Sequence, residues 1–286
     1  MAVHIAFLGP AGTFTEVAAR KYAAANYSAY HMAPFTTVGD VLLAVDDRQV
    51  DCGVVPVENS SEGTVVLTLD YLVHEVDVRI IGEVVVPIRH HLLGWDQAAL
   101  ESITDVVSHP QALAQCRRHL QQLLPHARLH MSHSTAAAVQ QVKESRNARM
   151  AALGTQLARE IYGLRILQAD MQDSDKNATR FLVVAKQPVP ASGDDKTSIV
   201  FGFKVDRPGN LYRALREFAI RNINLTKLES RPARRELGDY LFFADLDGHV
   251  DEAPVQAALA ELQKECSLVR VLGSYPQARS LNQNLE

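Results

Sequence analysis

The sequence has few cysteines, and no two of them lie close together in the chain. The three are Cys52, Cys116 and Cys266. An odd number of widely spaced cysteines argues against a disulfide framework and is typical of a reducing compartment. The chain also lacks an apolar stretch long enough to span a bilayer, and no basic segment precedes its short N-terminal apolar run. We therefore expect a cytoplasmic protein.

A strong charge of either sign is missing too. The 29 basic and 33 acidic residues give a formal net charge of −4, and the basic residues are not clustered. Such a chain has no positive field with which to attract nucleic acid or an anionic membrane, so we expect neither partner. With 47% hydrophobic residues the composition is that of a globular protein, and 286 residues suit two domains.

Clusters of metal-ligating side chains are also absent from the sequence pattern. His90 and His91 would point to opposite faces of a strand. The other closely spaced histidines have no acidic or cysteine partner at ligand spacing: His126, His130 and His133. The chain carries neither a P-loop lysine nor a dinucleotide fingerprint. We expect no metal ion and no cofactor.

Short apolar runs alternate with helical patterns along the first 186 residues. Val3–Leu8 predicts a buried strand, and Phe14–Ala25 predicts a helix with Thr13 as its N-cap. Ile80–Leu93 is a long β-rich run broken at Pro87. This alternation favours an α/β fold with parallel sheets. Further strands and helices are expected at Cys52–Val57, Leu67–Val73, Val106–Ser108, Gln111–Leu124, Leu129–Met131, Thr135–Val142, Met150–Leu153, Thr155–Tyr162 and Phe181–Ala185.

Residues 187–196 are rich in proline, glycine and charge, and predict a linker. After them, the order strand, helix, strand, strand, helix, strand predicts a βαββαβ unit, the ferredoxin-like arrangement. Its elements are expected at Ser198–Phe203, Leu211–Ile220, Asn224–Glu229, Tyr240–Leu246, Val255–Glu265 and Val269–Ser274.

Four polar motifs lie at the ends of predicted strands. Gly9–Thr15 joins a strand to a helix, where free amides and threonine hydroxyls can bind an anion. Val55–Thr64 and Ser108–Leu113 place hydrogen-bonding side chains where open α/β sheets bind ligands. Asn177–Phe181 carries a threonine and an arginine, and arginine is the best partner for a carboxylate. Taken singly, each motif is equally consistent with a capped helix or an ion pair.

Together the motifs resemble the prephenate dehydratase family. The family's GPxGTFT stretch is Gly9–Thr15, its VPxEN stretch is Val55–Asn59, its SHPQ motif is Ser108–Gln111, and its TRF motif is Thr179–Phe181. The unit after the linker resembles an ACT domain, because Asn224–Pro232 matches the INLTKIESRP signature almost letter for letter.

The resemblance implies a two-lobed α/β catalytic region at residues 1–186, similar to type 2 periplasmic binding proteins, with its active site between the lobes. Lobe one would comprise about residues 1–78 and 163–186, and lobe two about residues 79–162. Residues 197–276 would form the ferredoxin-like ACT regulatory domain, followed by a C-terminal tail at 277–286. No chorismate mutase segment precedes residue 1, so we expect a monofunctional enzyme.

The resemblance also implies a reaction, in which prephenate loses CO₂ and hydroxide and becomes phenylpyruvate on the route to phenylalanine. Thr179 is the expected donor to the departing hydroxyl, and Asn59, Ser108 and Gln115 would orient the substrate. Glu58 either orients Asn59 or is structural. The expected substrate-binding residues are Ala11, Gly12, Thr13, Phe14, Ser60, Arg180 and Phe181.

The ACT resemblance implies L-phenylalanine as effector, bound between paired ACT domains of a homodimer or homotetramer. The expected effector-binding residues are Gly209, Asn210, Leu211, Leu228, Glu229, Ser230, Arg231 and Pro232. Asn210 stands where the family usually has alanine, in the turn before the predicted helix.

Two other functions remain open on the sequence. Arogenate dehydratase carries out the same chemistry on a substrate with an amino group in its side chain. A protein that binds a small anion without catalysis would share the two-lobed fold. Turnover of prephenate would exclude the protein that only binds an anion. Comparison of kcat/KM for prephenate and arogenate would distinguish the two dehydratases.

Overall fold

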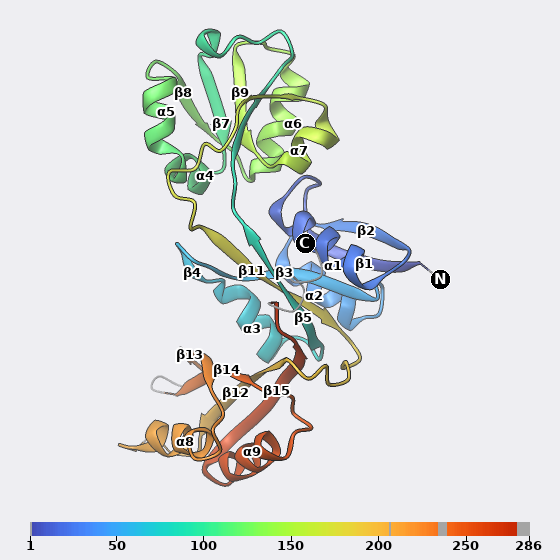
Figure 1. Ribbon diagram of the computed structural model, residues 1–286, viewed down its shortest axis with the longest axis vertical. Coiled ribbons are helices and arrows are strands. Elements are labelled where there is room, and N and C mark those ends of the chain that lie inside the picture. Colours follow the sequence, from blue (N-terminus) through green and yellow to red (C-terminus); the bar gives the residue numbers. More distant parts are fainter. Residues whose placement is uncertain (1, 206, 234–238, 279–286) are drawn as a thin grey trace.

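The computed structural model describes residues 2–205, 207–233 and 239–278 and contains three sheets, stacked along the long axis of the molecule (Figure 1). The first two belong to the two lobes of the N-terminal region, and the third belongs to the C-terminal domain. No helix in these described ranges is long and apolar enough to cross a membrane.

The first sheet has the strand order β2-β1-β3-β11-β5, with β4 added beside β3. Strands β1, β2 and β3 are parallel, whereas β11 runs antiparallel to both β3 and β5. Helix α1 covers one face, and α2 and α3 cover the other. The elements are β1 Val3–Leu8, α1 Phe14–Asn26, β2 Tyr30–Phe35, α2 Val38–Asp46, β3 Cys52–Asn59, β4 Gly63–Thr64, α3 Val66–His74, β5 Arg79–Pro87 and β11 Ala178–Ala185.

The second sheet has the order β10-β6-β9-β7-β8 and is flanked by short helices. Its elements are β6 His91–Gly94, the 3₁₀ turn η1 Leu100–Ser102, β7 Asp105–Ser108, α4 Pro110–Gln115, α5 Arg117–Leu123, β8 Arg128–Met131, α6 Thr135–Ser145, β9 Met150–Gly154, α7 Gln156–Tyr162 and β10 Arg165–Gln168. The chain thus leaves the first lobe once and returns once, which confirms the two-lobed α/β architecture.

Both crossings lie later in the chain than the boundaries expected near residues 78 and 162. Strand β5 pairs with β11 in the first sheet, and β10 pairs with β6 in the second. The crossings therefore follow Pro87 and Gln168. The two halves of the apolar run Ile80–Leu93 are alike in composition, so the sequence does not reveal that they pair with different sheets.

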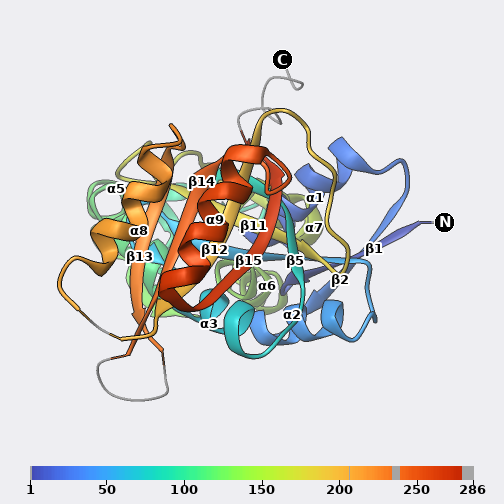
Figure 2. The same cartoon turned by 90° about the horizontal axis from the view of Figure 1, so that it is seen from below.

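The C-terminal domain is an antiparallel sheet of order β13-β14-β12-β15. Figure 2 shows α8 and α9 side by side on its outer face. The opposite face joins the core of the first lobe, through residues such as Val200, Phe243 and Tyr275. The elements are β12 Asp195–Phe203, α8 Asn210–Ala219, β13 Leu225–Pro232, β14 Tyr240–Asp247, α9 Ala253–Glu265 and β15 Cys266–Pro276, which confirms the βαββαβ prediction.

Three local features differ from the sequence-based expectations. Strands β2, β4 and β10 and helix α2 were not expected. In the case of β2 the reason is that it is an edge strand, contains Pro34 and has no β-branched residue. The helix expected at Gln111–Leu124 is two helices, since Asp173 accepts hydrogen bonds from the amides of Arg118 and His119 at the start of α5. The linker is shorter than expected, because β12 already begins at Asp195.

Gly273 of β15 lies directly against β5 of the first lobe. A Cβ atom at this position would overlap with the backbone of Ile80 in β5. Because backbone cannot move aside as a flexible side chain can, glycine is required for this contact.

We predict that Gly273→Ala lowers the free energy of unfolding by about 2 kcal/mol or more, the cost of forcing extra volume into a packed contact. Gly202→Ala in the neighbouring strand β12 is the matched control, because its Cβ would meet only the end of the Leu241 side chain, at 2.9 Å. Urea denaturation of both variants measures the difference. Equal losses would show that the approach of the domains does not depend on Gly273.

Candidate active site

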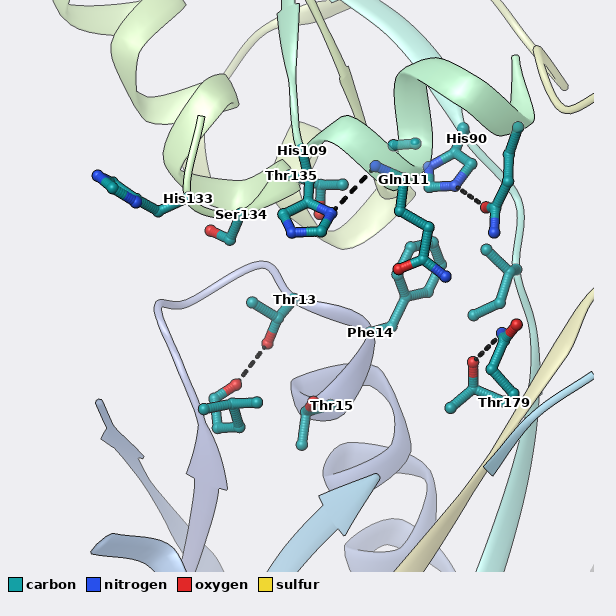
Figure 3. A pocket seen from close by; sticks show the side chains of 15 residues that line it. Thr13, Phe14, Thr15, His90, His109, Gln111, His133, Ser134, Thr135 and Thr179 are labelled. Atoms are coloured by element: carbon teal, nitrogen blue, oxygen red, sulfur yellow. Dashed lines mark hydrogen bonds between the residues drawn. The ribbon is translucent and has the colours of Figure 1, made fainter. Parts of the chain in front are cut away.

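A cavity of about 260 Å³ lies between the two lobes. Figure 3 shows side chains from both lobes that project into it. Its lining contains no lysine, arginine, aspartate or glutamate. The lining residues are Leu8, Thr13, Phe14, Thr15, Asn59, Ile88, His90, His109, Gln111, Ala112, Gln115, His133, Ser134, Thr135 and Thr179.

Thr179 and Asn59 form a hydrogen-bonded pair on the floor of the cavity. They lie opposite one another in the ladder between β11 and β3, and Asn59 Nδ2 donates to Thr179 Oγ1 at 2.8 Å. Asn59 Oδ1 accepts from the amides of Ser61 and Glu62 at 2.9 and 3.1 Å, which fixes the orientation of its amide group. Because the Thr179 oxygen accepts from Asn59, its hydroxyl proton is available to donate into the cavity.

His90 and Gln115 form a second pair, at the crossing between the lobes. His90 is 2% exposed, its Nε2 lies 3.2 Å from Gln115 Oε1, and its ring packs edge-on against Phe14. Burial lowers the pKa of His90 to about 4, so the ring is neutral at neutral pH. With the ring proton on Nε2, Gln115 Oε1 accepts it. Gln115 Nε2 is then a buried donor without a partner among the residues that the structure describes, as a ligand-facing amide would be.

Two helices present their N-termini to the cavity from opposite lobes. Thr13 caps α1 by accepting from the Glu16 amide, and Ser134 caps α6 by accepting from the Ala137 amide. The amides of the first turn have no carbonyl partner within the helix, and the helix dipole makes this end positive. The cavity can therefore bind anions although no cationic side chain lines it.

Several residues expected at the site serve structural roles nearby. The Ser108 hydroxyl is fully buried and donates to the Leu153 carbonyl at 2.9 Å. Ser60 Oγ accepts from the Ala178 amide at 3.0 Å, and Phe181 lies in the core beside α1. None of these three lines the cavity.

The loop before α1 is hydrogen-bonded to the second lobe. The Ala11 carbonyl accepts from Tyr162, and the Gly12 carbonyl accepts from Thr155 at 2.7 Å. The Gly12 amide is already bonded to Glu16 at 2.7 Å and is not free for a substrate. Of the expected loop residues, only Thr13 and Phe14 line the cavity.

Arg180 does not line the cavity, contrary to its expected role as a substrate anchor. Successive residues of a strand point to opposite faces, so Thr179 and Arg180 cannot face the same cleft. The Arg180 guanidinium lies behind the sheet, within 3.1 Å of carboxylate oxygens of Glu58, Glu83 and Asp245. Glu58, the neighbour of Asn59, faces the same way.

The expected effector-binding residues fall on two adjoining elements of the C-terminal domain. Gly209, with a positive φ of 87°, ends the turn before α8. The Asn210 side chain makes two hydrogen bonds to residues close to it in the chain. Its Nδ2 donates to the Val205 carbonyl at 2.7 Å, and its Oδ1 accepts from Arg213 at 2.6 Å. On the edge strand β13, the residues that remain exposed are Thr226, Leu228, Ser230 and Pro232.

The other residues of β13 face the first lobe. Glu229 accepts from Thr64 of β4, and Arg231 lies 3.5 Å from a carboxylate oxygen of Asp70 in α3. The expected effector segment therefore has one exposed face and one face in contact with the catalytic region.

Comparison with known proteins gives a family match for each of the two regions. Residues 5–189 match the prephenate dehydratase family, and residues 197–264 match the ACT domain family. A prephenate dehydratase of Methanocaldococcus jannaschii is 38% identical, over 93% of this chain and 96% of its own length. A bifunctional chorismate mutase/prephenate dehydratase of Aquifex aeolicus is 46% identical, over 96% of this chain and 74% of its own length.

Solved structures agree with these relatives. A prephenate dehydratase of Arthrobacter aurescens, in complex with L-Phe, superposes with a TM-score of 0.88 at 37% identity, covering 97% of this chain and 91% of its own. A protein described as a novel type of quorum quenching acylase, GqqA, superposes with a TM-score of 0.86 at 30% identity, covering 96% and 98%.

The buried neutral His90 makes stability depend on pH. The unfolded chain binds a proton at this histidine near pH 6.5, whereas the folded chain binds it only near pH 4. The free energy of unfolding therefore decreases as the pH falls from about 6.5 to about 4. We predict that the wild type loses about 3 kcal/mol more than His90→Asn between pH 6.5 and 4. Urea unfolding at a series of pH values measures both curves, and parallel curves would contradict the burial of a neutral ring.

Proposed function

The chain belongs to the prephenate dehydratase family, and from this premise we propose that it converts prephenate to phenylpyruvate, with CO₂ and water as the other products. The observation that carries the proposal is the pair Thr179–Asn59, which lines a cavity that the N-termini of α1 and α6 also line. Prephenate has its ring hydroxyl opposite its ring carboxylate. The cavity has a hydroxyl donor in one region and amide anion sites in another (Figure 3).

Thr179 acts on the leaving hydroxyl. As the C–CO₂ bond breaks, its electron pair enters the ring, and the C–O electron pair departs with the hydroxide. A hydrogen bond from the Thr179 hydroxyl stabilises the negative charge on that oxygen. Threonine is too weak an acid to transfer its proton early, so the strength of this hydrogen bond in a cavity shielded from water carries the effect. Asn59 holds the Thr179 oxygen in place.

The two carboxylates of the substrate bind to amides at the starts of α1 and α6. Thr13–Thr15 and Ser134–Thr135 supply these groups from opposite lobes. Substrate binding thereby draws the lobes together. Gln115, oriented by the neutral His90, donates its free Nε2 to the bound substrate. Ser108, Ser60, Glu58 and Phe181 support the site without touching the substrate.

The absence of charged side chains from the cavity lining favours prephenate over arogenate. Arogenate carries an ammonium group, which in a buried site calls for a carboxylate partner. No lining residue supplies one. Comparison of kcat/KM for the two substrates tests this preference, and the expected result is a higher value for prephenate.

Amide hydrolysis is a second candidate, favoured by the likeness to the quorum quenching acylase. A hydrolase of this kind needs a hydroxyl activated by a neighbouring base. Among the residues that line the cavity, no serine or threonine hydroxyl makes a hydrogen bond with a histidine ring. Incubation with an N-acyl homoserine lactone tests this activity directly, and we expect no turnover comparable with that of prephenate.

L-Phenylalanine regulates the enzyme through the ACT domain. The Arthrobacter aurescens relative was solved in complex with L-Phe. In this chain, the turn at Gly209 allows close backbone approach and the start of α8 offers amides to a carboxylate, while Leu228 on β13 is 41% exposed and can face the turn of a second ACT domain. Strand β13 is an unpaired edge, which suits pairing of ACT domains in a homodimer or homotetramer with the effector between them.

The buried thiols are consistent with a cytoplasmic enzyme. Cys52, Cys116 and Cys266 are all free and buried. Burial raises the pKa of Cys52 to about 12 and that of Cys266 to about 11, so neither forms the reactive thiolate at neutral pH.

The role of Thr179 is tested by two substitutions. Thr179→Ala should lower kcat by roughly two to four orders of magnitude, the range that a positioned proton donor contributes, while the fold is retained. Thr179→Ser keeps the hydroxyl and should retain much of the activity. Steady-state assays of phenylpyruvate formation measure both. A kcat of the alanine variant within a few-fold of wild type would refute the assignment.

Phenylalanine should inhibit the enzyme, and the Asn210 side chain should support its binding. Asn210→Ala removes two hydrogen bonds that hold the turn, so we expect the inhibition midpoint to rise about tenfold while the uninhibited kcat is unchanged. Lys264→Gln, at an exposed site on α9, is the control. Calorimetry that detects no phenylalanine binding at millimolar concentration would refute the sensing role.

A further inference from the structure

The ladder between β3 and β11 carries different residues on its two faces. Asn59 and Thr179 are paired on the face toward the cavity. One residue earlier and later, Glu58 and Arg180 are paired on the opposite face, toward the ACT domain. The same short stretch of two strands therefore contacts the substrate on one side and the regulatory domain on the other.

A buried charge cluster occupies the ACT side of this ladder. Arg180 lies 2.8 Å from an Asp245 oxygen and 3.1 Å from oxygens of both Glu83 and Glu58, and its side chain is only 14% exposed. Lys196 lies 2.8 Å from Glu83, and Lys227 lies 3.4 Å from Glu58. Three cations and three carboxylates meet here, and Lys227 also lies 3.4 Å from Glu229. Arg180, Glu58 and Glu83 come from the catalytic region, and Asp245, Lys196 and Lys227 come from the ACT domain.

The cluster holds its members in a single arrangement. Arg180 uses both terminal nitrogens of a rigid planar group, and Asp245 is further fixed by the Ser198 hydroxyl at 2.6 Å. Separating two buried opposite charges is disfavoured, so a shift of Asp245 pulls on Arg180 against its contacts with Glu58 and Glu83. Arg180 is covalently next to Thr179, and the ladder with β3 is irregular immediately after Arg180. On its other side β11 pairs regularly with β5 from Ala178 to Val183, so Thr179 and Arg180 belong to one continuous strand segment and the position of one constrains the other.

Strand β13 connects the cluster to the exposed face on which the effector is proposed to bind. Lys227 and Glu229 point to the catalytic lobe, where both contact Thr64 of β4. Leu228 lies between them and points the other way. A displacement of β13 would therefore act on β4 and on Glu58 together.

We propose that Arg180 is a positioning residue through which the ACT domain sets the geometry of Thr179. The inference rests on the proposed dehydratase activity and adds the route of its regulation. Phenylalanine acts on β13 and on the Asp245 side of the cluster, Arg180 follows, and the hydrogen bond of Thr179 to the leaving hydroxyl is weakened. Inhibition by this route lowers kcat more than it raises KM, because the helix N-termini that bind the carboxylates are not part of the cluster.

Asp245→Asn tests the route, since it removes one charge from the ACT side and preserves the shape of the side chain. Glu261→Gln is the matched control, a carboxylate in an exposed ion pair of the same domain. We expect Asp245→Asn to lower kcat per folded molecule about tenfold, to leave KM within about threefold, and to shift the phenylalanine midpoint about fivefold or more. Glu261→Gln should match the wild type in all three.

A double-mutant cycle gives the readout that a merely structural role would not produce. In an Arg180→Met background the effect of Asp245→Asn on kcat should largely disappear, because the residue that transmits it is gone. Additive effects, or a wild-type kcat and phenylalanine midpoint in Asp245→Asn, would overturn the proposal. If the wild type itself does not convert prephenate, the proposed function fails instead, so the two failures are distinct.

Lys227→Gln covers the case in which Asp245→Asn does not fold. It leaves neither of the carboxylates that Lys227 contacts unpaired, because Glu58 retains Arg180 and Glu229 retains Arg231. The expected result is a shifted phenylalanine midpoint, and an unchanged midpoint would count against the route through β13.

Discussion

The structure depends on the pairing of β11 with β3. Strand β11 follows the whole second lobe in sequence, yet it inserts between β3 and β5 and completes the first sheet. This insertion brings Thr179 to within 2.8 Å of Asn59, although the two are 120 residues apart in the chain. It also places the two crossings next to each other, because one leaves the first lobe from β5, the other enters it at β11, and these two strands are paired. Without this pair of strands there would be neither a cleft nor the two polar side chains at its floor.

The cleft is polar but carries no charged side chains, and this has a physical consequence. A substrate with two carboxylates would normally be expected to meet arginine or lysine. Here the positive potential comes from the N-termini of α1 and α6, whose amides are fixed by the helices. Fixed dipoles need no reorganisation when charge moves during the reaction, which is the condition for electrostatic stabilisation of a transition state. A neutral His90 fits this arrangement, because a charged ring at this position would compete with the helix amides for a substrate carboxylate.

The charged groups of the catalytic strands are gathered on the reverse side of the sheet, where the ACT domain covers them. Alternation along β3 and β11 separates Asn59 and Thr179 from Glu58 and Arg180. The ACT domain is attached at this face by the cluster around Arg180 and by the close backbone contact at Gly273. The ACT domain therefore lies directly behind the hydrogen-bonded pair Asn59–Thr179, on the other face of the same two strands.

The sequence by itself determined most of the elements, the two regions, the family and four of the polar residues that line the cleft, Thr13, Asn59, Gln115 and Thr179. Those follow from local patterns: apolar runs, N-caps such as Thr13, and the motifs around Asn59 and Thr179. It could also have shown that Thr179 and Arg180 face opposite ways, since adjacent strand residues alternate. Only the tertiary structure decided which strands share a sheet, that Ser108 bonds to a carbonyl, and that His90 meets Gln115. Those outcomes depend on contacts between residues far apart in the chain, and no local pattern records which distant partner a side chain will find.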